Sequence, residues 1–216
     1  MAFKGWPAEA IEFYEGLEAD NSKAYWTENK SVYERAVYGP MSELLIELAA
    51  GFGEGKIFRP YRDVRFSRDK APYKTAMGAA LANGGYVQFS ANGLGVGTGT
   101  YQMAADQLAR YRQAVAADSS GVALERLIAV LDRRGISVHG HDSLKTAPKG
   151  YPKDHPRIDL LRNKGLVAWQ EWPPGEWLGT ARAKKKVVDF LHATKPVTEW
   201  LAEHVGPSSL EPDRWG

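Results

Sequence analysis

Cationic and aromatic side chains gather in one short stretch of the chain, between Lys56 and Lys74 (KIFRPYRDVRFSRDKAPYK). The stretch holds seven Lys or Arg residues and two Asp residues, a net charge of +5, whereas the whole chain has a net charge of +2. Its aromatic residues alternate with the cations instead of standing apart from them. Because a solvated run of charges usually carries few aromatic rings, we expect this stretch, the basic segment, to contact an anionic partner.

Seven side chains of the basic segment are candidates for binding the anion. Arginine suits planar groups that accept two hydrogen bonds, lysine supplies a point charge, and tyrosine can donate a hydrogen bond or stack. The candidates are Arg59, Arg62, Arg65, Arg68, Lys70, Tyr73 and Lys74. Asp63 is expected to orient one of the arginines.

The composition of residues 57–66, rich in aromatic and β-branched types, predicts a β-strand. Alternate side chains of a strand face opposite ways. Arg62 and Arg68 then share a mostly apolar face and are expected to be partly buried. Arg59, Asp63 and Arg65 share the polar face. A buried guanidinium group needs a carboxylate or a bound anion as its partner.

Three interpretations of the basic segment follow from this pattern. The leading one is an arginine-lined pocket for a small ligand that bears a phosphate or a carboxylate. The second is a surface for nucleic acid, because cations mixed with aromatic rings also suit single strands. The third is a structural network of ion pairs with Asp63, Asp69 and the acidic helices, with no ligand.

Few residues are candidates for catalysis, and whether the protein is an enzyme stays open. The chain has no cysteine, which excludes disulfides, thiolate nucleophiles and cysteine-based metal sites. His155 and Asp63 are the candidates for a general acid or base. Ser67 lacks a G-x-S-x-G context, and no Walker motif is present. We expect no cofactor and no metal, since His139 and His141 would need a third ligand.

The elements that must position these residues come in the order helices, hairpins, helices. Helical periodicity between Pro7 and about residue 52 predicts three helices, with Asp20 or Asn21 as the cap of the second. Gly39-Pro40 is expected to break the second helix, and Pro40 to start the third. Residues 73–82, 86–91 and 94–101 are predicted strands, and Asn92-Gly93 is a tight-hairpin signal. Predicted downstream are helices over 105–117, 122–134 and 156–163, strands over 136–140 and 166–172, and a last helix from residue 181, interrupted by Pro196.

Sequential hairpins flanked by helices indicate an α+β fold. We expect a single domain over residues 1–207, with an antiparallel meander sheet flanked by N-terminal helices, two middle helices and a C-terminal helix. Residues 208–216 are expected to form a frayed tail.

The bulk composition is that of a globular protein, with 216 residues, 44% of them hydrophobic and 25% charged. The N-terminus has no apolar signal core, and the apolar runs are too short to span a bilayer. The sequence therefore predicts a cytoplasmic protein without a membrane partner.

Three separated motifs resemble those of a bacterial family of conserved hypothetical proteins, domain of unknown function 2461. The motifs are GLEADNSKAYWTENKSVYE, FRPYRDVRFSRDKAPYKT and LKTAPKGYPKDHPRIDLLRNKGL, and they follow the family's order. The resemblance extends over about residues 3–205. It implies one domain of roughly this length and no particular activity, substrate or cofactor.

Overall fold

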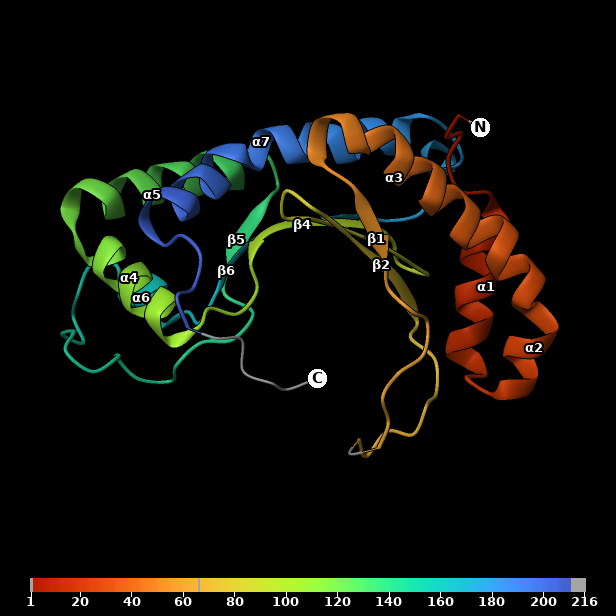
Figure 1. The fold of residues 1–216 in the computed structure, drawn as a ribbon, viewed down its shortest axis with the longest axis horizontal. Coiled ribbons are helices and arrows are strands. Elements are labelled where there is room, and N and C mark those ends of the chain that lie inside the picture. Colours follow the sequence, from red (N-terminus) through yellow and green to blue (C-terminus); the bar gives the residue numbers. More distant parts are fainter. Residues whose placement is uncertain (1, 66, 211–216) are drawn as a thin grey trace. The chain divides into compact units, whose positions relative to one another are not determined.

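The computed structural model describes residues 2–65 and 67–210. The elements in chain order are α1 (Ala8–Ala19), α2 (Lys23–Val32), the π-helical η1 (Tyr33–Tyr38), α3 (Gly39–Phe52), β1 (Gly55–Ile57), β2 (Ala76–Leu81), β3 (Gly85–Ser90), β4 (Gly93–Thr100), α4 (Ala105–Ala116), α5 (Asp118–Asp132), β5 (Ser137–His139), α6 (Ile158–Arg162), β6 (Leu166–Trp172), the 3-10 helix η2 (Glu176–Gly179) and α7 (Arg182–His204). Figure 1 shows this order in colour.

The strands form one open antiparallel sheet in the order β1-β2-β3-β4-β6-β5. The first four strands are neighbours both in the chain and in the sheet, which is the meander that the turn signals predict. The predicted α+β class, with helices before, within and after the strand block, is confirmed.

The chain divides into two compact units. The first unit consists of residues 1–96 and 171–190, and the second of residues 97–170 and 191–216. The expected single domain over residues 1–207 stays a prediction. The units are described separately below, and the basic segment belongs entirely to the first.

The N-terminal helices of the first unit bury one apolar face each. Phe13, Tyr14 and Leu17 are the large buried residues of α1. The hydroxyl of Ser22 caps α2 by accepting a hydrogen bond from the backbone N–H of Tyr25 at 3.1 Å. This cap fixes the sharp bend between α1 and α2.

The predicted break at Gly39-Pro40 is wrong. The chain passes from α2 through the π-helical turn η1 into α3 without leaving the helical conformation. Pro40 stands at the start of α3, where a missing N–H costs little. The wider π turn before it buries Tyr33, Ala36 and Val37, and this packing holds the helix together.

The β3–β4 hairpin confirms the Asn-Gly turn signal. Gly93 has a φ of +106°, a conformation that a residue with a side chain rarely adopts. A Cβ atom there would lie 2.2 Å from the carbonyl oxygen of Trp172. Glycine is therefore required at this position both by the turn and by the close approach of the backbone from β6.

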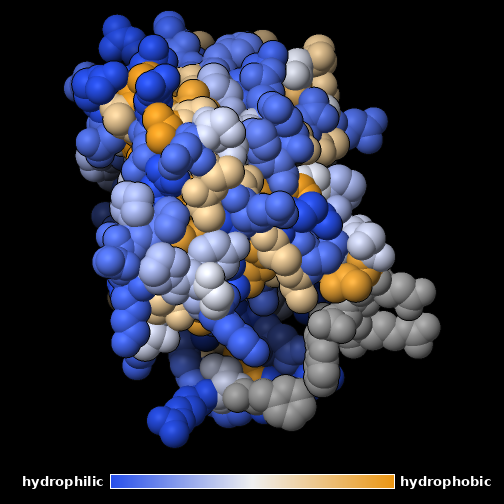
Figure 2. Space-filling view, turned by 90° about the vertical axis from the view of Figure 1, so that its left-hand side faces the viewer, coloured by the Kyte–Doolittle hydropathy of each residue, from blue (hydrophilic) through white to orange (hydrophobic). Residues whose placement is uncertain are grey.

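In the second unit, α4 packs against α5 and α6, and α5 packs against β5. Helix α5 begins at Asp118, four residues earlier than the sequence predicts. The space-filling view in Figure 2 shows hydrophobic side chains scattered among hydrophilic ones over the face it presents. Exposed apolar residues of this unit include Val130, which is 41% exposed.

The predicted interruption of the last helix at Pro196 is also wrong, because α7 runs unbroken from Arg182 to His204 with Pro196 inside it. Proline in a helix interior removes one backbone hydrogen bond. Buried side chains stand on both sides of it in the second unit, Leu191 and Val197 among them. Their packing offsets the lost bond and keeps the helix continuous.

Part of the predicted C-terminal tail is held in place. The carboxylate of Asp106 accepts hydrogen bonds from the hydroxyl of Ser208 at 2.7 Å and from the backbone N–H of Ser209 at 2.8 Å. These bonds hold the pKa of Asp106 well below its usual range. Residues 211–216 of the predicted tail lie outside the described residues.

Arg157 is the buried charge of the second unit, with only 4% of its side chain exposed. It donates to the carbonyl oxygens of Val115 at 2.7 Å and Ala116 at 3.0 Å, and to the carboxylate of Asp118 at 2.7 Å. The guanidinium group thus satisfies carbonyls at the end of α4 and fixes the start of α5.

We expect Arg157→Met to lower the free energy of unfolding by about 2–3 kcal/mol, because buried carbonyls would lose their donors. Urea denaturation followed by circular dichroism measures this loss. The matched control is Arg133→Met, at an exposed position of the same unit, for which a change within about 0.5 kcal/mol is expected. Equal stabilities of the two variants would contradict a bracing role for Arg157.

Candidate functional site

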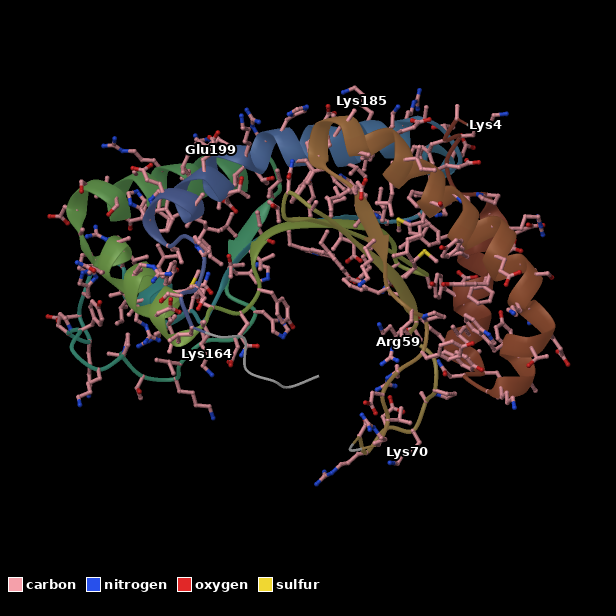
Figure 3. The ribbon with its side chains drawn as sticks, viewed as in Figure 1. Lys4, Arg59, Lys70, Lys164, Lys185 and Glu199 are labelled. Atoms are coloured by element: carbon pink, nitrogen blue, oxygen red, sulfur yellow. The ribbon has the colours of Figure 1, made fainter. Side chains whose placement is uncertain are left out.

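Most of the basic segment lies in a long projecting loop, residues 58–75, which we call the finger. It leaves the sheet at the end of β1, returns to it at the start of β2 and extends away from both strands (Figure 1). Arg59 lies near its base and Lys70 near its tip (Figure 3). The cations of the segment are therefore displayed on a projection.

Backbone hydrogen bonds close the base of the finger. The N–H of Phe58 donates to the carbonyl of Gly78 at 2.9 Å. The N–H of Arg62 donates to Pro72 and that of Lys74 to Pro60, each at 2.8 Å. Each proline lacks an N–H and serves as an acceptor, so the two arms are paired without a regular strand.

The predicted strand over residues 57–66 is therefore wrong, since β1 ends at Ile57. The pairing of the arms reduces to one isolated bridge between Tyr61 and Tyr73. Because these residues do not form a strand, the assignment of their side chains to two opposite faces no longer applies. Arg62 is half-buried, as predicted, but Arg68 is exposed. Phe66, which strand alternation would put on the same face as these two arginines, lies outside the described residues.

Asp63 organises one side of the fingertip. Its Oδ1 accepts a hydrogen bond from the backbone N–H of Arg65 at 3.2 Å, and its Oδ2 accepts one from the guanidinium group of Arg65 at 2.7 Å. These hydrogen bonds lower the pKa of Asp63 to about 2. Asp63 was expected to orient one of the arginines, and its carboxylate holds the guanidinium group of Arg65. A carboxylate so stabilised as an anion is a weak base near neutral pH.

Asp69 likewise holds one backbone N–H and one arginine of the finger. Its Oδ1 accepts a hydrogen bond from the backbone N–H of Ala71 at 2.9 Å, and its Oδ2 accepts one from Arg62 at 2.5 Å. The backbone hydrogen bond and then Arg62 hold the pKa of Asp69 below its usual range. The two aspartates thus neutralise two of the four arginines and fold the loop at the same time.

The other cations of the finger are not paired with a carboxylate among the described residues. Arg59 and Arg68 have no hydrogen-bond or ion-pair partner there, and both are exposed. The Lys70 amine donates to the carbonyl oxygen of Val64 at 3.0 Å. The Lys74 amine lies 5.9 Å from the ring centre of Phe58. The finger therefore presents surplus positive charge beside aromatic surface.

Two aromatic rings of the finger are open to solvent. Phe58 is 40% exposed and Tyr61 is 49% exposed. Large exposed rings among cations are the combination that stacks with bases or other planar groups.

Tyr73, the other aromatic residue that the structure describes in the finger, attaches it to the helices. It is buried and stacks on Trp26 of α2, with ring centres 4.4 Å apart and planes at 7°. The side chain of Asn21 clamps its backbone, accepting from the Tyr73 N–H at 3.0 Å and donating to the Tyr73 carbonyl at 3.2 Å. Burial raises the pKa of the Tyr73 phenol. Tyr73 thus mainly holds the finger against the helices. It can contact a ligand only where it lines the cleft described in the next paragraph.

A cleft of about 530 Å³ opens beside the base of the finger in the first unit. Its walls come from the α1–α2 junction, the finger and strands β2 and β3. The lining residues are Glu18, Asn21, Arg62, Asp69, Ala71, Tyr73, Lys74, Thr75, Ala76, Tyr86 and Gln88. Of the seven predicted ligand contacts, Arg62, Tyr73 and Lys74 line this cleft, whereas Arg59, Arg65, Arg68 and Lys70 do not.

Sequence reasoning missed several cleft residues. Tyr86 and Gln88 stand two apart on β3 and therefore share a face, a signal that alternation alone could have given. The Tyr86 ring fits because Gly78 on the neighbouring strand has no side chain, since a Cβ there would lie 2.3 Å from the Tyr86 hydroxyl. Asn21 carries only a helix-cap signal in the sequence, and nothing local marks Glu18.

The two candidates for a general acid or base belong to different units. Asp63 lies in the first unit and His155 in the second. The Nδ1 of His155 accepts a hydrogen bond from the backbone N–H of Arg157 at 3.0 Å. This contact is the local turn role that a histidine before a proline commonly takes. Within the described residues, no group of three or more His, Asp or Glu side chains is close enough to hold a metal ion.

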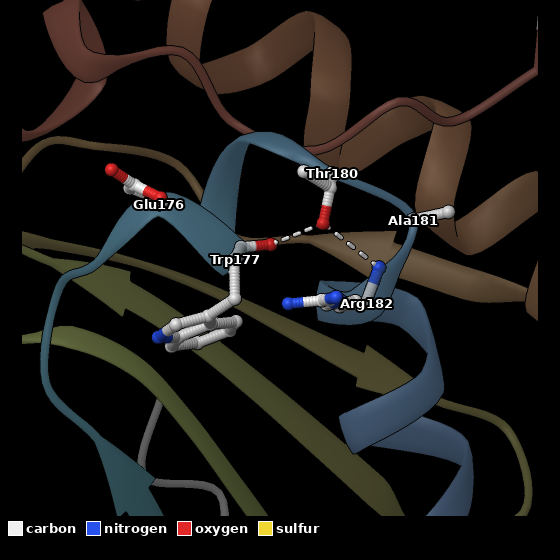
Figure 4. A pocket seen from close by; sticks show the side chains of 5 residues that line it. All are labelled: Glu176, Trp177, Thr180, Ala181 and Arg182. Atoms are coloured by element: carbon white, nitrogen blue, oxygen red, sulfur yellow. Dashed lines mark hydrogen bonds between the residues drawn. The ribbon is translucent and has the colours of Figure 1, made fainter.

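A second hollow of the first unit, about 360 Å³, lies where the chain enters α7 (Figure 4). It is lined by Glu176, Trp177, Thr180, Ala181 and Arg182. The Thr180 hydroxyl donates to the Trp177 carbonyl at 2.7 Å and accepts from the Arg182 N–H at 3.2 Å. These bonds form a helix cap, so the hollow is explained by local structure.

The lysines that follow in α7 are each engaged. Lys184 forms an ion pair with Glu47 at 2.6 Å, and Lys185 forms one with Asp189 at 2.6 Å. The Lys186 amine lies about 5 Å from the ring centres of Trp172 and Trp177. This second basic stretch is therefore structural in its described contacts, unlike the finger.

None of the helices that the structure describes combines the length and the apolar character needed to cross a membrane.

Comparison with known proteins identifies a family but no activity or ligand. The family model described as a conserved hypothetical protein (DUF2461) matches residues 9–200. No curated protein matches the chain. A solved structure of a conserved hypothetical protein from Pyrococcus furiosus is similar over 77% of this chain and 96% of that one, with 13% identity and a TM-score of 0.38.

We expect the Arg65→Gln substitution to raise the pKa of Asp63 from about 2 toward its ordinary value near 3.9, because the guanidinium donor is lost. Carboxyl-carbon NMR across a pH titration measures it. Since the folded pKa of Asp63 is lowered, the Asp63–Arg65 contact is complete above the ordinary pKa and lost as the pH falls through about 2. An unchanged pKa in the variant would contradict the contact.

Proposed function

The chain belongs to a family described only as conserved hypothetical proteins (DUF2461), and we propose that its finger binds an extended polyanion, the phosphate backbone of a nucleic acid. The proposal rests on the position of the finger's positive charges that no carboxylate neutralises. Arg59, Arg68 and Lys70 are exposed on a projection and form no ion pair among the described residues, although Arg59 contributes electrostatically to the lowered pKa of Asp63.

The order of the three sequence-based interpretations changes with this geometry. A pocket for a small anion needs guanidinium groups that converge in a concavity. Arg62 is the one arginine of the finger that lines the cleft, and it shares its charge with Asp69. A polymer with regularly spaced phosphates instead matches cations that are spread along a loop.

The exposed rings favour a single strand over a duplex. Phe58 and Tyr61 are open to solvent at the base of the finger, where unpaired bases could stack on them. Bases in a duplex are stacked on each other and do not offer their faces. Stacking is tolerant of sequence, so little preference among bases is expected along the finger.

A small anionic ligand bound in the cleft is the second candidate function. The observation that favours it is that Arg62 and Lys74 both line a cleft whose volume, about 530 Å³, falls in the range of ligand pockets. The third interpretation, a structural network of ion pairs, is favoured for Arg65 by its ion pair with Asp63. It is favoured only in part for Arg62, which pairs with Asp69 and also lines the cleft.

We expect the double substitution Arg59→Ala/Arg68→Ala to weaken binding of a labelled single-stranded oligonucleotide by about tenfold at low salt, because two phosphate contacts are lost. The slope of log affinity against log salt concentration should fall by about 1.4. Fluorescence anisotropy at several salt concentrations measures both quantities.

The matched control is Arg133→Ala/Arg134→Ala, which removes the same charge from exposed positions of the second unit. It should leave the affinity within about twofold. If both double variants weaken binding equally, net charge explains the binding and the finger does not. If the natural protein binds no oligonucleotide even at low salt, the proposed function is wrong.

A further inference from the structure

The cleft and the exposed surface of the finger are continuous. The Phe58 ring centre lies 6.3 Å from that of Tyr86 and 5.9 Å from the Lys74 amine. Tyr86 and Lys74 both line the cleft, whereas Phe58 belongs to the exposed surface. A strand stacked on Phe58 would therefore have its next nucleotide at the mouth of the cleft.

The cleft offers two kinds of polar contact. Lys74 supplies positive charge for a phosphate group, and Arg62 adds guanidinium donors, although it shares its charge with Asp69. The Asp69 carboxylate is already occupied by Arg62 and by the Ala71 N–H. The Glu18 carboxylate, exposed at the end of α1, has no partner among the described residues. It remains an acceptor for a donor group of the ligand.

Such a pair of contacts matches a nucleoside phosphate better than a simple anion. A simple phosphate or carboxylate would meet Arg62 and Lys74 but would gain nothing from Glu18, which repels it. A nucleotide places its phosphate at some distance from base donors that a carboxylate accepts. Gln88, which also lines the cleft, has an amide that both donates and accepts.

The volume admits one such unit. About 530 Å³ lies within the range of pockets that hold drug-sized ligands, whereas a duplex cannot enter a space of this size. A terminal phosphate also differs from an internal one in charge. A phosphate monoester carries nearly two negative charges near pH 7, so the Lys74 amine, which has no ion pair among the described residues, attracts a strand end more strongly than the middle of a strand.

We propose that the cleft takes the phosphorylated end of a nucleic-acid strand whose backbone lies along the finger. The proposal rests on the proposed function, because the finger must hold the strand that leads into the cleft. The finger supplies affinity without regard to ends, and the cleft adds the preference for an end.

The test compares oligonucleotides about 12 nucleotides long that carry a 5′-phosphate, a 3′-phosphate or neither, together with a circular single strand and a free nucleoside monophosphate. Binding is measured by competition anisotropy. We expect one phosphorylated end to bind about tenfold more tightly than the unphosphorylated strand, and the circle to bind no better than the unphosphorylated strand.

Two lysine variants separate the cleft from the finger. Lys74→Ala removes a charge that lines the cleft, and Lys70→Ala removes one at the fingertip that does not. Lys74→Ala should abolish the preference for the phosphorylated end while binding to the unphosphorylated strand persists. Lys70→Ala should weaken every linear strand by a similar factor and keep the preference.

The outcomes distinguish the two proposals. A circle that binds as tightly as the phosphorylated strand would overturn end recognition and leave the proposed function standing. A free nucleoside monophosphate that binds as tightly as the phosphorylated strand would make the ligand a free nucleotide, and would also overturn it. If no strand and no circle binds, the proposed function itself fails.

Discussion

The clamp between Asn21 and Tyr73 is the contact on which the candidate site depends. Its two hydrogen bonds join residues far apart in the chain and fix the returning arm of the finger to the α1–α2 junction. The stack of Tyr73 on Trp26 adds buried aromatic area at the same point. Without this attachment the cleft would lose a wall, and the contact of Tyr61 with Trp26 would be left as the aromatic link between the finger and α2 among the described residues.

The charged residues of the finger fall into two groups, those that shape the loop and those that stay exposed. Asp63 and Asp69 each hold one arginine and one backbone N–H, so half of the finger's arginines shape the loop and are partly neutralised. The remaining cations form no ion pair among the described residues, so their positive charge is not neutralised by a carboxylate. A segment with a net charge of +5 can thus be ordered without burying its charge, because the carboxylates act locally and leave the excess exposed.

Much of the fold could be predicted because its signals are local. Asn92-Gly93 specifies a hairpin by backbone conformation alone, and the strands on either side were found nearly residue for residue. Breaks at Gly39-Pro40 and Pro196 were predicted wrongly for the opposite reason. There, burial of neighbouring apolar side chains outweighs the local preference of proline, and burial is not visible in a short window.

The site was predicted in part, for a related reason. The composition of the basic segment identified the finger's cations, but strand alternation misplaced Arg68. The strand does not form because the side chains of Asp63 and Asp69 compete with a regular ladder. The cleft is assembled from three stretches distant in sequence, so Glu18 and Gln88 carried no signal that linked them to Lys74. The charged and aromatic residues of the site could be identified from one segment of the sequence. The cleft could not, because it forms only when distant segments pack together.

Amide hydrogen exchange, measured with and without a single-stranded oligonucleotide, shows whether the finger is the binding element. We expect slower exchange in the finger and at Asn21–Ser22 beside it, with exchange in α5 unchanged and the protection lost at high salt. Protection confined to the second unit, or absent everywhere at low salt under saturating oligonucleotide, would contradict the claim that the finger is the binding element.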